Sequence, residues 1–111
     1  MERFEKFNTS RQEALRLSIA LEEFCREEIP AEHRAVYIGY LHRRLRPALL
    51  TLVRQDDTLS LTALTQIVSL PAEALNDAIA LAASEKRTAA LVWLLRYKRE
   101  TFGFADRDFS L

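Results

Sequence analysis

Glycine, proline and cysteine are scarce in this chain of 111 residues, and these shortages argue against an all-β fold and against an internal disulfide. With only two glycines and three prolines, the chain has few residues for the turns that an all-β fold needs, so helices throughout are favoured. The single cysteine, Cys25, has no second cysteine in the chain for a disulfide and suits a reducing compartment. The sequence therefore predicts an all-α fold in a cytoplasmic protein.

An excess of charge of one sign is also missing, because 16 Lys and Arg residues balance 16 Asp and Glu residues. A neutral chain has no overall attraction to nucleic acid or to an anionic membrane. No apolar run approaches the roughly 20 residues that span a bilayer, and residues 1–12 lack the apolar stretch of a signal peptide. Hydrophobic residues make up 49 % of the chain, so we expect a single domain, residues 1–111, with a buried core and no contact with membranes.

Patterns for catalysis and for metal binding are absent as well. His33 and His42 are too far apart for an i, i+4 metal pair, and Cys25 is not at ligand spacing from either. Cys25 has no adjacent base, and its place beside an apolar helix face favours a small core residue. No phosphate-binding loop or dinucleotide turn occurs. We therefore expect no enzyme activity, no metal site and no cofactor.

Apolar residues recur at helical spacing along the chain and predict about five or six helices in antiparallel pairs. Ser10 and Glu13 form a capping-box pattern that is expected to open the first helix. Pro47 lies inside the second apolar stripe, where it either kinks one helix or separates two helices between Arg44 and Pro47. The predicted domain has, in chain order, N-terminal helices at 10–46, helical hairpins at 47–69 and 71–101, and a C-terminal tail at 102–111.

The C-terminal half repeats itself when the chain is shifted by about 30 residues, a spacing that places Thr58 on Thr88 and apolar residues on apolar residues. Each half reads as a helix, a polar turn, a threonine and a second helix, which indicates a stack of helix pairs. Thr88 is expected to cap the helix that follows it, and either Thr58 or Ser60 is expected to cap the corresponding helix of the first hairpin.

Two segments of this half carry a resemblance to a known family. Leu81-Ala82-Ala83 and the run from Leu91 to Leu95 resemble the two helices of an ankyrin repeat, and residues 94–98 (LLRYK) resemble the last hairpin of ankyrin-like bacterial proteins. The match departs from the family at Lys86, where the ankyrin repeat has glycine. The resemblance covers residues 47–104, and it implies an ankyrin-like stack of two helical hairpins and no established activity.

Protein–protein interaction is the function that we expect first. Aromatic residues and arginine are enriched at binding hot spots, and the candidate partner surface consists of Arg43, Arg44, Arg46, Tyr37, Tyr40, Tyr97, Phe102 and Phe104. The arginines either face an acidic partner or pair with the acids of the first helix, Glu22, Glu23, Glu27 and Glu28. The second interpretation is favoured because the net charge of the chain is zero.

A nucleic-acid-binding regulator is the alternative, because residues 61–81 also resemble a helix-turn-helix. The would-be recognition helix, which starts at Pro71, offers Glu73, Asn76 and Asp77, and it has no cation before Lys86. Acids repel the phosphate backbone, so such a regulator would depend on the Arg43, Arg44 and Arg46 patch.

The last helix, Ala89 to Lys98, is too apolar for the end of a helical stack. Either the tail at 102–111 covers it, or a second copy of the chain does so in a two-fold dimer. The polar segment Asp106-Arg107-Asp108 suits water and favours the dimer.

Leu94 lies in the middle of this apolar surface, and Leu94→Ala is expected to lower the free energy of unfolding by about 2–5 kcal/mol, as is usual for a buried leucine. Urea denaturation measures the change. A loss below about 0.5 kcal/mol is typical of a surface position and would contradict the predicted stack.

Overall fold

The computed structural model describes residues 3–103, and within them all regular secondary structure is helical. Seven helices follow one another: α1 (Arg3–Thr9), α2 (Glu13–Glu23), α3 (Ala31–Arg43), α4 (Leu45–Arg54), α5 (Thr58–Thr65), α6 (Ala72–Ser84) and α7 (Thr88–Phe102). The predicted all-α class is confirmed, with seven helices in the described range where five or six were expected.

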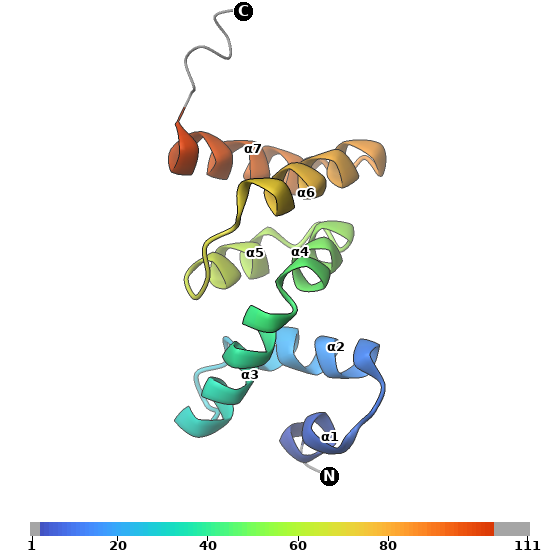
Figure 1. The fold of residues 1–111 in the computed structure, drawn as a ribbon, viewed down its shortest axis with the longest axis vertical. Helices are drawn as coiled ribbons and strands as arrows, with labels where there is room; N and C mark the ends of the chain where they lie inside the picture. Colours follow the sequence, from blue (N-terminus) through green and yellow to red (C-terminus); the bar gives the residue numbers. More distant parts are fainter. Residues whose placement is uncertain (1–2, 104–111) are drawn as a thin grey trace, which may run out of the picture.

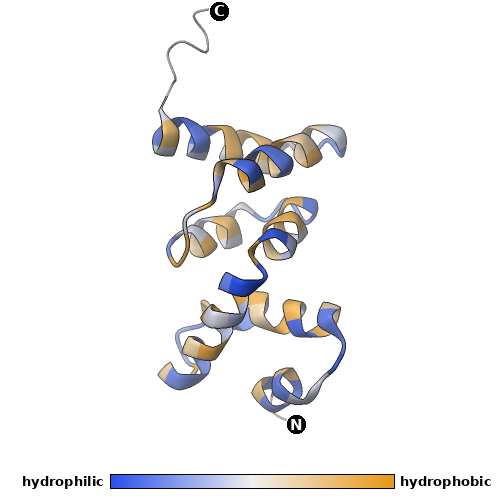
Figure 2. Cartoon of the chain, in the orientation of Figure 1, coloured by the Kyte–Doolittle hydropathy of each residue, from blue (hydrophilic) through white to orange (hydrophobic). Residues whose placement is uncertain are grey.

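The helices form layers along the long axis of a molecule that measures 55 × 26 × 20 Å. α1, α2 and α3 occupy the N-terminal end, α4 and α5 the middle, and α6 and α7 the C-terminal end (Figure 1). α6 packs against both α7 and α4, which joins the last two layers. Apolar and polar residues alternate around most helices (Figure 2), as expected where each helix buries one face.

One continuous core of apolar side chains runs through all three layers. Leu94 is completely buried in it, at 0 % exposure, as the apolar run of the last helix indicates. Cys25, expected in the core, is exposed instead, because α2 ends at Glu23 and leaves Cys25 in the following loop.

The N-terminal segment contains a helix that the sequence pattern did not predict. α1 precedes Ser10, and the expected capping box does not form, because the Ser10 hydroxyl accepts a hydrogen bond from the Gln12 N–H at 3.0 Å. α1 is held by Phe7, whose ring lies edge-on to the rings of Tyr37 and Tyr40 at 5.1 and 5.0 Å. Such edge-to-face pairs stabilise beyond the area that they bury.

Pro47 belongs to a new helix and does not kink an old one. α3 ends at Arg43 and α4 begins at Leu45, while Arg44 between them has φ −118° and ψ 38°, outside the helical region. Pro47 falls in the first turn of α4, where its missing N–H has no partner to lose. The chain therefore leaves the N-terminal layer at Arg44 and enters the middle layer.

The turns that end α4 and α6 have the same geometry, 30 positions apart. Asp56 and Lys86 both have positive φ, 56° and 59°. In each turn the last two N–H groups return to the carbonyls of the helix just ended, with the following bonds: Asp56 N–H to Val53, Asp57 N–H to Leu52, Lys86 N–H to Ala83, and Arg87 N–H to Ala82. This is the Schellman arrangement for ending a helix. The backbone thus repeats at the predicted spacing, and the likeness to ankyrin repeats stays a prediction.

The first of these turns also caps a helix in the next layer. Oδ1 of Asp56 accepts a hydrogen bond from the N–H of Ala90, in the first turn of α7, at 2.7 Å. Neither predicted threonine cap forms: Asp57 caps α5 through the Ser60 N–H at 3.1 Å, and Arg87, which makes no side-chain cap, precedes Thr88. A carboxylate from the middle layer therefore satisfies an N–H that α7 leaves without a partner in its own helix.

Asp56→Ala removes this cap, and Lys86→Ala at the equivalent position is the matched control, because both replace a positive-φ residue in a Schellman turn. We expect Asp56→Ala to lower the free energy of unfolding by about 1–2 kcal/mol more than Lys86→Ala, the usual cost of a lost N-cap. Urea denaturation of both variants measures the difference. Equal losses would mean that the bond between the layers contributes nothing.

Candidate functional site

The exposed large apolar side chains gather on two helices. Five such residues occur in the described part of the chain, and all but Val36 lie on α5 or α7. We call these four the outer face, and they are Leu59 (83 % exposed), Val92 (50 %), Leu95 (49 %) and Phe102 (47 %). Exposed large apolar side chains that gather on neighbouring helices are typical of interaction sites in soluble proteins.

A shallow hollow of about 590 Å³ lies beside the outer face, where α5 and α7 begin. Val92 and Trp93 supply its apolar lining, and Asp56 and Arg96 its charged groups. Because α5 and α7 both contribute to it, the hollow connects the middle layer to the last layer.

An aromatic pair holds α7 in place behind the outer face. Trp93 stacks on Tyr97 with ring centroids 5.5 Å apart, and its indole N–H donates to Oγ1 of Thr62 on α5 at 3.0 Å. The Tyr97 hydroxyl accepts a hydrogen bond from the Leu70 N–H at 3.1 Å. Both polar ends of the pair are therefore satisfied within the chain, and the outer face rests on a fixed support.

Positive charge flanks the apolar residues of α7. Arg96, Lys98 and Arg99 are exposed, against the single acid Glu100 on the same helix. Lys98 donates to the neutral side chain of Asn76 at 3.2 Å, and Arg96 has no ion pair within residues 3–103. The outer face is consequently apolar with a basic border.

Two of the predicted partner residues are not on the surface. Tyr37 and Tyr40 are 2 % and 3 % exposed, so the prediction that they contact a partner is wrong. The reason is α1, whose Phe7 covers both rings. The Tyr40 hydroxyl donates to Oε1 of Glu13 at 2.7 Å.

The three arginines of the predicted basic patch differ in their contacts. Arg44 pairs with Glu13 at 3.3 Å and Arg46 pairs with Asp77 of α6, whereas exposed Arg43 has no ion pair within residues 3–103. The prediction that these arginines pair with Glu22, Glu23, Glu27 and Glu28 is therefore wrong, because their ion-pair partners are Glu13 and Asp77. Glu22 and Glu23 instead pair with Arg3 of α1.

Tyr97 and Phe102 are the predicted residues that do lie at the outer face, Tyr97 partly buried beneath it and Phe102 exposed. Phe104 lies outside the described residues. Val92 and Leu95, which belong to the helix expected to need a cover from the tail or from a second copy, complete the face. The sequence does not reveal that these two side chains are exposed, because α7 is apolar on both sides.

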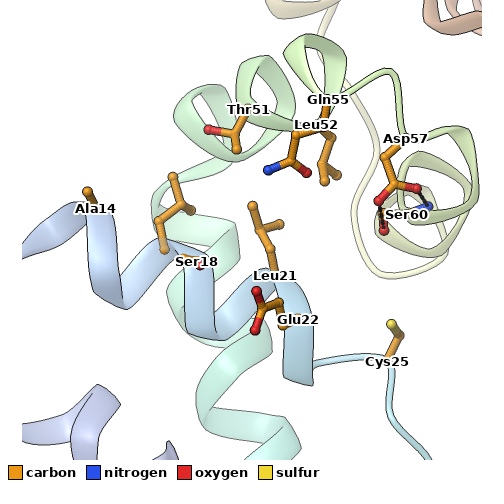
Figure 3. A pocket seen from close by; sticks show the side chains of 11 residues that line it. Ala14, Ser18, Leu21, Glu22, Cys25, Thr51, Leu52, Gln55, Asp57 and Ser60 are labelled. Atoms are coloured by element: carbon orange, nitrogen blue, oxygen red, sulfur yellow. Dashed lines mark hydrogen bonds between the residues drawn. The ribbon is translucent and has the colours of Figure 1, made fainter.

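A second cavity, of about 380 Å³, lies between α2 and α4 (Figure 3). Leu21 and Leu52 face each other across it, and Cys25 lies at its edge. Its carboxylates are already engaged, Glu22 with Arg3 and Asp57 with the Ser60 hydroxyl at 2.8 Å. No histidine lines the cavity, so the thiol has no base beside it. Within residues 3–103 no group of His, Cys, Asp and Glu side chains is arranged to hold a metal ion.

The helix-turn-helix-like segment falls on α5, α6 and the connection between them. On α6, Asp77 pairs with Arg46 and Asn76 accepts the hydrogen bond from Lys98. Glu73 is exposed in the first turn. The side of α6 that a DNA-reading helix would turn to the groove is therefore acidic and partly engaged within the chain.

Comparison with known proteins adds no relative, since no family model, curated protein or solved structure matches this chain. None of the helices formed by residues 3–103 combines the length and the apolar character that crossing a bilayer requires.

The buried hydroxyl of Tyr40 makes the stability of the fold depend on pH in the alkaline range. Burial, followed by the hydrogen bond to Glu13, raises the pKa of Tyr40 to about 12 from its ordinary 10. The folded protein thus keeps a proton that the unfolded chain releases above about pH 10. The stabilisation is complete below pH 10 and is lost as the pH rises toward 12.

Tyr40→Phe should therefore remove part of the alkaline loss of stability, because phenylalanine has no proton to release. Urea denaturation of both proteins at several pH values between 9 and 12 measures the free energy of unfolding. Parallel curves for the two proteins would contradict the raised pKa of Tyr40.

Proposed function

We propose that this chain is a non-catalytic protein–protein interaction module that binds its partner through the outer face. The observation that carries this proposal is the placement of exposed large apolar residues, four of five on α5 and α7. Single exposed apolar residues are ordinary, whereas a group of them on adjacent helices marks a binding surface.

The support behind the face favours binding as well. Trp93 and Tyr97 are held by hydrogen bonds to Thr62 and to the Leu70 backbone, so a partner meets a surface whose parts are already ordered. Preformed surfaces lose less conformational entropy on association.

Two further parts of the proposal rest on the sequence pattern. The repeated turn geometry at Asp56 and Lys86 supports an ankyrin-like stack of hairpins, a scaffold in which short repeats present one extended surface. The single cysteine suits a reducing compartment, so we place the module in the cytoplasm. The acidic exposed side of α6 makes nucleic acid the less favoured partner.

A photo-crosslinking amino acid at Leu95, tested in the native host, examines this proposal directly. The matched control places the same amino acid at Ala80, which is exposed on α6 away from the outer face. We expect a discrete protein adduct from position 95 and none from position 80. Equal adducts from both positions, or none from position 95, would contradict the proposed binding face.

A further inference from the structure

The exposed residues of α7 follow a seam that suits a second helix. Val92, Leu95, Arg99 and Phe102 are separated by three, four and three positions, and each is exposed. This spacing is that of the a and d positions in a heptad, where one helix packs lengthwise on another. Leu94, two positions from Val92, is completely buried on the opposite side of the helix. α7 therefore packs on its own chain with one side and presents a helix-binding seam with the other.

The charges beside this seam are all positive. With Val92 and Leu95 as a and d, Arg96 is the e position and Lys98 the g position. Side chains at e and g form ion pairs with the facing helix and select its charge. A facing helix with Asp or Glu at these positions would meet Arg96, which has no ion pair within residues 3–103.

A second copy of this chain does not fit the same seam. In an antiparallel pair e faces e and g faces g, so Arg96 would meet Arg96 and Lys98 would meet Lys98. In a parallel pair g faces the e position five residues further on, so Lys98 would meet Gly103, while Arg99 would meet Arg99 of the second copy at an a position. Like charges repel in either orientation.

We propose that the partner contributes an acidic amphipathic helix that lies along α7, with apolar residues toward Val92, Leu95 and Phe102 and with carboxylates toward Arg96 and Lys98. This rests on the proposed function and names the chemistry of its partner. The seam covers ten helical steps from position 92 to position 102, about 15 Å, so a partner helix of roughly 14 residues spans it with a turn to spare.

Two synthetic peptides test the proposal on the full chain. One has leucine at a and d and glutamate at e and g, and its twin has lysine in place of every glutamate. Binding is followed through the fluorescence of Trp93, the only tryptophan of the chain. We expect the glutamate peptide to bind and the lysine peptide to bind at least about tenfold more weakly, since two or more ion pairs of up to about 1 kcal/mol each are replaced by repulsions.

Exchanging the charges on the protein supplies the decisive control. The double variant Arg96→Glu with Lys98→Glu should reverse the preference and bind the lysine peptide better. Arg43→Glu, which changes an exposed arginine on α3, should leave the preference unchanged. Leu95→Ala should weaken binding of the glutamate peptide by about tenfold, as the loss of a central apolar contact does.

Several results would overturn the proposal. These are equal binding of the two peptides, absence of binding up to millimolar peptide, no reversal in the double variant, or self-association of the free chain that Leu95→Ala abolishes. Binding to anionic phospholipid vesicles without binding to the glutamate peptide would assign the seam to a membrane surface. A protein adduct from position 95 together with any of these peptide results would leave the proposed function standing and remove only the acidic helix.

Discussion

Every helix of this protein depends on a neighbouring layer, because helices shorter than about 12–15 residues are marginal in water and the longest helix described has 15 residues. The molecule meets this constraint by stacking helices so that each turns its apolar side to a neighbour. Asp56 shows how closely the layers cooperate, because its backbone ends α4 in a left-handed turn and its carboxylate caps α7 in the next layer. The middle layer thus stabilises the start of the last one.

The same stacking leaves the two sides of the last layer with different chemistry. The exposed side of α6 carries Glu73, Asn76 and Asp77, two of which are used to hold Lys98 and Arg46. The exposed side of α7 carries Val92, Leu95 and a border of cations. Since α7 has no further layer to pack against within residues 3–103, Val92 and Leu95 stay exposed, and their heptad spacing is the basis of the proposed partner helix.

At the other end of the molecule, polar contacts around one carboxylate join α2, α3 and the residue that separates α3 from α4. Glu13 of α2 accepts the hydroxyl of Tyr40 on α3 and pairs with Arg44, which links α3 to α4. The hydrogen bond from Tyr40 is the largest of the effects that lower the pKa of Glu13. Phe7 of α1 covers the Tyr40 ring. Arg44 therefore works as an internal connection at the break between α3 and α4, and this use explains why the basic patch does not form one free surface.

Local sequence determined the helical class and the spacing of the repeated turns, while contacts between distant residues decided the place of α1, the helix caps and the exposed side of α7. Apolar periodicity and the scarcity of glycine and proline predicted the all-α class, because both are properties of short segments. The shift of about 30 residues predicted the spacing of the two matching turns, at Asp56 and Lys86. Periodicity does not reveal that α1 covers Tyr37 and Tyr40, or that Asp56 caps α7, because these partners are far apart in the chain. α7 is apolar on both sides, so only tertiary packing decides that Leu94 is inside and that Leu95 is exposed.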